Sequence, residues 1–185
     1  MGRHLPKIGI IPRTGRVYAT LSRLGVLMTE CRKPVDPSDD AAAPDGLRPI
    51  VWSTAFEMGD ARIDAEHREF VGIVNRLSAA VEAREPDRVA EICKVLVEHS
   101  ANHFRHEEEV MAEHSYGGLE GHRRDHERLL ADICEQTERL CRPTASWQEH
   151  VEAAANIKDA LLGHLFRVDV HYKTHLQEAG GRLRR

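Results

Sequence analysis

The stretch of sequence that decides the fold is HFRHEEEVMAEHSYGGLEGHRRDH, residues 103–126. His103 and Glu107 are four residues apart, and so are His122 and His126 on the other side of a glycine-containing break. Residues four apart lie on the same face of a helix about one turn from each other, so each pair can aim two ligand atoms at one point. Two helices joined by a short loop pack antiparallel, which lets both pairs face the same point. The stretch therefore predicts a helical hairpin with a polar seam that suits a transition metal.

Apolar residues recur at helical spacing in four segments of the chain. The first follows a possible cap at Asp60 or Asp64, and the second follows Pro86, a residue favoured in the first turn of a helix. Breaks are expected at residues 117–118, at 141–143 and at 180–181, and a capping box of Ser146 and Glu149 opens the fourth segment. The pattern predicts an all-α protein, an up-down-up-down four-helix bundle over residues 50–180 with a basic tail at 181–185.

Residues 1–49 carry six prolines and no sustained helix or strand period, which predicts a disordered N-terminal extension. Met28 is an alternative start of translation, and a docking role for the extension stays open. The net charge of -4 argues against a nucleic-acid partner. No apolar run approaches the roughly 18 residues of a membrane span, and the cysteines show no CxxC pairing. We therefore expect a cytoplasmic protein with reduced cysteines.

Each predicted helix brings polar residues to its inward seam. These residues are His67, then His103 and Glu107, then His122 and His126, then His164 with Asp169 nearby. Buried polar groups need partners, and hydrogen bonds alone would leave several of these unsatisfied, whereas metal coordination satisfies them together. Five imidazoles and two carboxylates exceed the needs of one ion and suit two six-coordinate ions bridged by the carboxylates. Such a site favours iron over zinc, which prefers about four ligands.

One spacing does not fit an ideal helix. His164 and Asp169 are five residues apart, about 140° around the helix axis. Either the carboxylate approaches from the side or the helix widens locally into a π-bulge. The remaining histidines are expected to be solvated surface residues, as are Glu108 and Glu109, although Glu108 could neighbour the site. These histidines are His4, His106, His114, His150, His171 and His175.

The pieces taken together resemble the bacterial hemerythrin family over residues 52–176. The matching motifs are Ile63-Asp64-x-x-His67, His103-Phe104-x-x-Glu107-Glu108-x-x-Met111, Tyr116 followed by His122-x-x-x-His126, and His164-x-x-x-x-Asp169-x-x-Tyr172. The resemblance implies that His122, His126 and His164 hold one iron, that His67 and His103 hold the other, and that Glu107 and Asp169 bridge them. It also implies that O2 binds at the two-histidine iron, in a pocket lined by Leu161. His99 stands where the family usually has a tyrosine, and it is either support for the site or a packed seam residue.

The first hypothesis for function is thus reversible O2 binding for storage, delivery or sensing, by a monomer that is not an enzyme. The alternatives are a di-iron oxidase, a peroxidase, a nitric-oxide-handling enzyme or an iron store. Ferritin-like oxidases use Glu-x-x-His pairs, and no histidine of this sequence has a glutamate three residues before it. Delivery to an oxygen-using enzyme or to a signalling partner stays open.

Overall fold

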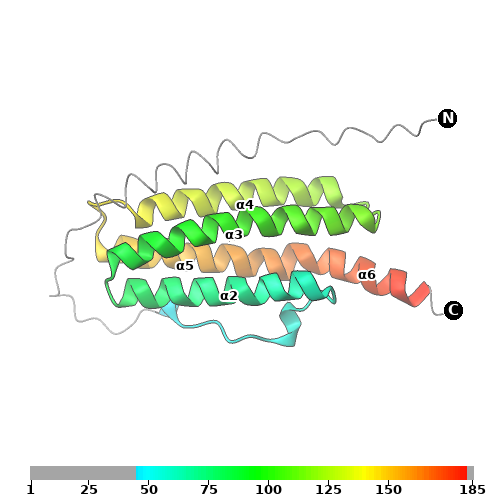
Figure 1. Cartoon of the computed structure of the whole chain (residues 1–185), viewed down its shortest axis with the longest axis horizontal. Helices are drawn as coiled ribbons and strands as arrows, with labels where there is room; N and C mark the ends of the chain where they lie inside the picture. Colours follow the sequence, from blue (N-terminus) through cyan, green and yellow to red (C-terminus); the bar gives the residue numbers. More distant parts are fainter. Residues whose placement is uncertain (1–44, 183–185) are drawn as a thin grey trace.

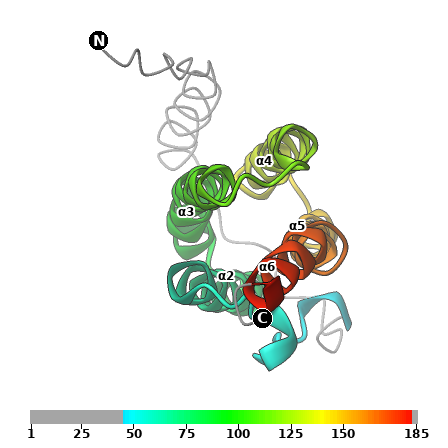
Figure 2. The same cartoon turned by 90° about the vertical axis from the view of Figure 1, so that its right-hand side faces the viewer.

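Four long helices lie side by side and form the body of the protein (Figure 1). The computed structural model describes residues 45–182. The helices are α2 (Ala61–Glu82), α3 (Pro86–Glu113), α4 (Leu119–Leu140) and a fourth that combines α5 (Trp147–His164), the π-helical segment η3 (Leu165–Asp169) and α6 (Val170–Arg182). Each helix packs against the next and α5 also packs against α2, so the helices close into a ring when seen end-on (Figure 2). The predicted all-α four-helix bundle is confirmed.

The helices begin where the sequence predicts. Asp60 caps α2 by accepting hydrogen bonds from two backbone N–H groups of the first turn. Asp64, the other candidate, instead accepts bonds from the backbone of the loop that precedes the helix. Pro86 is the first residue of α3, where its missing N–H has no helical partner to lose. Ser146 and Glu149 form the predicted capping box of α5, each side chain accepting a bond from the other residue's backbone N–H.

Two helix ends differ from the sequence prediction. The helix α3 ends at Glu113, before the glycine pair at 117–118, because Ser115 adopts a left-handed φ of 53° that a helix cannot continue through. The glycines lie in the turn that leads into α4. At the C-terminal end, α6 continues past the glycine pair at 180–181 to Arg182.

Apolar side chains fill the bundle in two clusters with a polar layer between them. The small cluster consists of Met58, Ile63, Met111 and Tyr172. The large cluster contains side chains from all four helices and lies on the opposite side of the polar layer from the small cluster. On α2, Ile63 belongs to the small cluster, Phe70 belongs to the large one, and His67 lies between them. Apolar packing therefore borders the polar layer on both sides along the bundle axis.

Residues 45–52 form a strap that contacts α2 and α5. Leu47 is buried in the large cluster, and Lys158 of α5 donates hydrogen bonds to the carbonyl groups of Gly46 and Arg48. Packed structure thus begins before residue 50, the boundary that the composition indicates. The predicted disorder of the preceding part of the extension, and the alternative start at Met28, lie outside the described residues.

None of the helices in the described range 45–182 is long and apolar enough to cross a membrane.

Candidate metal centre

Five buried side chains converge between α3, α4 and the fourth helix. Glu107, His122, His126, His164 and Asp169 each offer one ligand atom, and these atoms all lie within 4.8 Å of one another. The Nε2 atoms of His122 and His126 are 3.0 Å apart, and they lie 3.1 Å and 3.2 Å from the same oxygen, Oε2 of Glu107. We refer to this set as the five-residue group.

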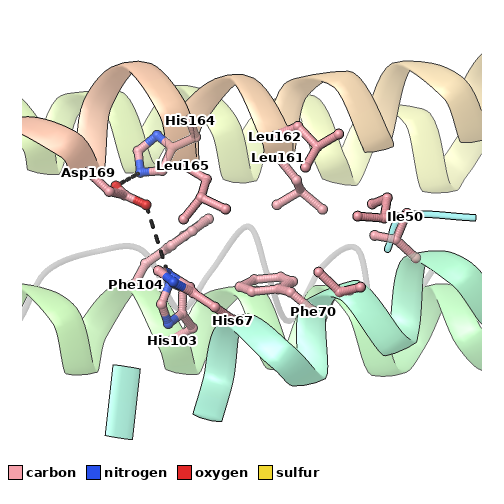
Figure 3. Close-up of a pocket in the computed structure, with 12 residues that line it drawn as sticks. Ile50, His67, Phe70, His103, Phe104, Leu161, Leu162, His164, Leu165 and Asp169 are labelled. Carbon is pink, nitrogen blue, oxygen red and sulfur yellow. Dashed lines mark ion pairs between the residues drawn. The ribbon is translucent and has the colours of Figure 1, made fainter. Parts of the chain in front are cut away.

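His67 and His103, the other two predicted ligands, lie beside the five-residue group. The Nε2 atom of His67 is 3.8 Å from Oδ2 of Asp169, and the rings of His67 and His103 pack edge to face with their centroids 4.9 Å apart. Both histidines are buried. In Figure 3 the two rings rise from α2 and α3 toward Asp169 on the fourth helix. The seven predicted ligands thus lie together as a group of five and an adjacent pair, and Asp169 lies between the two sets.

A π-helical segment explains how Asp169 reaches the site. Residues 165–169 form this segment directly after His164, so the wider turn carries the fifth residue onto the face that the histidine occupies. Nε2 of His164 and Oδ1 of Asp169 are 2.9 Å apart as a result. The sequence allowed either a carboxylate that approaches from the side or a π-bulge, and the structure contains the π-bulge. π-bulges are frequently found at functional sites because they re-aim a side chain within an otherwise regular helix.

Hydrogen bonds on the outer side of the rings fix their orientation. Nδ1 of His67 donates to the carbonyl group of Phe56 at 3.1 Å, and Nδ1 of His103 donates to the carboxylate of Glu66 at 2.9 Å. Nδ1 of His126 donates in the same way to Glu108 at 2.9 Å. Because each acceptor can only receive a proton, Nδ1 carries the hydrogen and Nε2 is left with a lone pair directed inward. This is the arrangement that metal-ligating histidines usually have.

Sequence reasoning missed Glu66 and misjudged three other residues. One of them is His150, which is half-buried and has a buried Nε2 atom, so it is not a solvated surface histidine. Glu66 lies one position before His67, off the inward seam of α2, so the helical period gives no reason to select it. Glu108 is not solvated, because only 5% of its surface is exposed. It instead neighbours the site, which was the alternative that the sequence left open. His106 is half-buried and donates from Nδ1 to Glu66 at 2.7 Å, so it is not a solvated surface histidine. Only a cross-helix contact reveals these roles.

His99 packs behind the site without contacting its ligand atoms. Its ring lies parallel to that of His103, with centroids 6.4 Å apart, and meets Phe70 edge to face at 4.4 Å. Its Nε2 lies 3.1 Å from the carbonyl oxygen of Glu66. Of the two roles the sequence allowed, these contacts favour the packed seam residue.

Burial and neighbouring charges set the protonation of the site. Burial lowers the pKa of His103 and of His164 to about 4, so both rings are neutral near pH 7, the form that binds a metal. Burial raises the pKa of Glu107, but the hydrogen bond from His122 and the other imidazoles around the carboxylate outweigh it and hold the pKa well below the usual range.

Asp169 shows the opposite behaviour. Burial, and after it the negative charge of Glu107, raise the pKa of Asp169. Two buried carboxylates this close together repel each other when both are ionised, and a cation offsets this repulsion. A cation bound between the two carboxylates would therefore stabilise the ionised form of both.

Three buried polar atoms of the site have no hydrogen-bond partner in the described structure: Oε1 of Glu107, Nε2 of His164 and Oδ1 of Asp169. The last two lie 2.9 Å apart but are not aligned for a hydrogen bond. Leaving such groups unsatisfied is costly, because each loses its hydration without a replacement. All three belong to the five-residue group, so a metal ion bound there would satisfy them together. The residues present thus fit a cation.

A small apolar cavity adjoins the site. Its volume is about 40 Å³, and its walls include His67, His103, His164 and Asp169 at one end and Leu161 and Ile50 farther along. Figure 3 shows Leu161 and Phe70 on opposite sides of this cavity, between the ligand side chains and Ile50. The cavity is therefore next to the two-histidine side of the site, and Leu161 lines it.

Comparison with known proteins identifies relatives over the bundle. The family model described as hemerythrin HHE cation binding domain matches residues 58–176. A bacteriohemerythrin of Pseudomonas aeruginosa is 27% identical over 118 residues, which cover 64% of this chain and 70% of that protein. One of the hemerythrin subunits of Sipunculus nudus is 31% identical over 128 residues, 69% of this chain and 94% of that protein. A bacteriohemerythrin of Ralstonia nicotianae is 33% identical over 90 residues, 49% of this chain and 62% of that protein.

Proposed function

Because the chain belongs to the hemerythrin HHE cation-binding family, we propose that its buried histidine and carboxylate cluster holds two iron ions and binds O2 reversibly. The observation that carries the proposal is the division of seven buried ligand side chains into a group of five and an adjacent pair around Asp169. A single ion has no use for seven ligands, whereas two six-coordinate ions that share carboxylates use them all.

In this proposal His122, His126 and His164 hold one iron, while His67 and His103 hold the other. Glu107 and Asp169 would serve both ions. The convergence of the first three histidines with both carboxylates supports the first assignment, and the contact of His67 with Asp169 supports the second. The ion held by His67 and His103 would have fewer protein ligands than the other, and the chemistry it would supply is the binding of O2.

The surrounding residues orient the ligands and exclude water. Glu66, Glu108 and the carbonyl group of Phe56 fix three of the imidazole rings through their Nδ1 hydrogens. Leu161 and Phe70 line the cavity beside the two-histidine side. An apolar wall there keeps water and protons away from a bound ligand, and this protection is what makes oxygen binding reversible.

A binding protein fits this site better than an enzyme does. The carboxylates that neighbour the ligands accept hydrogen bonds from ligand histidines and are engaged as orienting groups. Burial raises the pKa of Glu66, but hydrogen bonds from His103 and His106 outweigh it and hold the pKa at about 2, so Glu66 stays ionised and is a poor proton donor near pH 7. We propose a monomer that stores, delivers or senses O2 in the cytoplasm, with delivery to an oxygen-using enzyme or a signalling partner as its context.

The optical spectrum of aerobically purified protein, taken with an iron count on the same sample, tests this function. We expect two irons per chain and a visible charge-transfer band that disappears under argon and returns on exposure to O2. An iron-loaded sample whose spectrum ignores O2 would point to iron storage. A band that decays irreversibly while O2 is consumed would point to an oxidase.

A further inference from the structure

The far end of the cavity is lined by a residue that belongs to none of the bundle helices. Ile50 is on the strap, residues 45–52, and its side chain lines the cavity opposite the ligand histidines. Figure 3 shows Ile50 at the end of the cavity away from Asp169, beyond Leu161 and Phe70. Ile50 is half-buried, so it borders both the cavity and solvent.

Asn75 of α2 holds the backbone of Ile50 at two points. Its Oδ1 accepts a hydrogen bond from the Ile50 N–H at 2.7 Å, and its Nδ2 donates to the Ile50 carbonyl group at 2.9 Å. One side chain thus pairs with both polar backbone groups of a single strap residue, much as a neighbouring strand would. On the other side of the strap, Lys158 of α5 bonds to the carbonyl groups of Gly46 and Arg48. The strap is therefore fastened to both helices that flank the cavity.

The cavity suits a ligand of very few atoms. A volume of about 40 Å³ is roughly three times the 10–15 Å³ that one water-sized probe needs. Its lining between the ligand residues and the strap is aliphatic and aromatic, including Val74, Leu161 and Leu162. Such a lining favours a small uncharged ligand over an ion, because an ion would lose its hydration there.

We propose that Ile50 is the outer gate of this cavity and that Asn75 is the latch that holds the gate closed. Small uncharged ligands reach the histidine end from the strap side, between α2 and α5, when Ile50 moves aside. The identity of the ligand as O2 rests on the proposed function, but the gate is a property of the cavity and the strap. A gate acts on the rates of entry and exit alike, so it changes both by the same factor and leaves the affinity unaltered.

The experiment measures the exchange of dissolved xenon with the cavity by 129Xe NMR, on protein as isolated, because xenon is apolar and needs no metal. In Ile50→Ala and Asn75→Ala, exchange is expected to be faster by roughly threefold to tenfold, since the gate is smaller or less firmly held. Ile50→Trp is expected to slow exchange by a similar factor. Rates of O2 association and dissociation, measured by stopped flow, should change by the same factors.

Two matched variants serve as controls. Val51→Ala truncates the next strap residue, which is 83% exposed and does not line the cavity. Asn156→Ala removes an exposed asparagine of α5 whose side chain contacts Gln136 and not the strap. Both should exchange xenon at the wild-type rate. Circular dichroism and the melting temperature establish that each variant is folded, and Asn75→Ala carries the test if the larger Trp side chain prevents folding.

Unchanged xenon exchange in folded Asn75→Ala and Ile50→Ala would overturn the gate. A change in only one of the two O2 rates, association or dissociation, would also overturn the gate. Such a change alters the affinity, which would place Ile50 in the binding site itself. If xenon exchange follows the prediction and no reversible O2 binding is found, the gate stands and the proposed function fails.

Discussion

The carboxylate of Glu66 lies between two histidines of α3 and accepts a hydrogen bond from Nδ1 of each, at 2.9 Å from His103 and 2.7 Å from His106. One of these histidines is a proposed iron ligand and the other is half-buried near the surface. Glu66 therefore both orients His103 and places a negative charge behind its ring. A negative charge there increases the electron density at Nε2, which strengthens its bond to a cation.

Glu66→Ala is expected to weaken iron binding at the two-histidine position by about 10–100-fold, because His103 loses the acceptor that fixes its ring. Iron per chain should fall from two toward one in elemental analysis at limiting iron. Glu66→Gln retains an acceptor and should lose less. Glu69→Ala is the control, since this α2 glutamate has a side chain that is 60% exposed and lies 3.7 Å from His99. Equal iron retention in Glu66→Ala and Glu69→Ala would show that Glu66 does not support the site.

Leu161→Ala is expected to keep both irons and to autoxidise roughly tenfold faster, because a smaller side chain admits water to the cavity. Leu130→Ala is a matched control: both leucines are partly buried against the large cluster, and only Leu161 lines the cavity. Each truncation should cost about 2 kcal/mol of stability or less, below the range for fully buried leucines. The decay of the oxygenated spectrum measures the difference. Equal decay in the two variants would make Leu161 an ordinary core residue.

Deleting Arg167, an exposed residue of the π segment, should shorten the spacing between His164 and Asp169 from five residues to four. The segment can then become regular α-helix, which changes the position and orientation of the Asp169 carboxylate relative to His164. We expect the metal-free protein to melt at the wild-type temperature or above, while iron binding weakens. Thermal unfolding followed by circular dichroism, with an iron titration, tests both parts. Full iron affinity after the deletion would mean that the π segment has no role in the site.

Removing the metal should destabilise the fold, because the buried carboxylates and unpartnered site atoms would lose the cation that satisfies them. Binding to the native state alone, at a free iron concentration 100 times the dissociation constant, contributes about 2.7 kcal/mol. For a domain of this size that corresponds to roughly 5–10 °C in the melting temperature. Calorimetry on chelated and reconstituted protein measures the shift. Coincident melting curves would contradict a buried site.

Helical periodicity in the sequence was sufficient to predict the fold and most of the side chains that face the site. The inward positions of His67, His103, Glu107, His122 and His126 follow from four-residue spacing on amphipathic helices, and the structure brings their side chains together. The fold and the helix starts follow from the same periodicity and from capping residues.

Contacts between elements that are distant in sequence could not be read in this way. Glu66 and His106 meet across two helices, and Asn75 reaches a strap residue 25 positions earlier in the chain. Neither contact lies on an apolar seam, so no period points to it. The exact end of α3 could not be predicted either, because it depends on the left-handed φ of Ser115 and not on the glycines that follow.

The most direct test of reversible di-iron oxygen binding is the amount of O2 taken up per iron and recovered on deoxygenation. Reduced, iron-loaded protein is titrated with O2 in a sealed cell fitted with an oxygen electrode, then purged while the released gas is counted. We expect one O2 bound for each pair of irons, nearly all of it recovered as O2, with the same uptake in a second cycle. Uptake that continues beyond this ratio, or bound O2 that is not recovered, would contradict reversible binding.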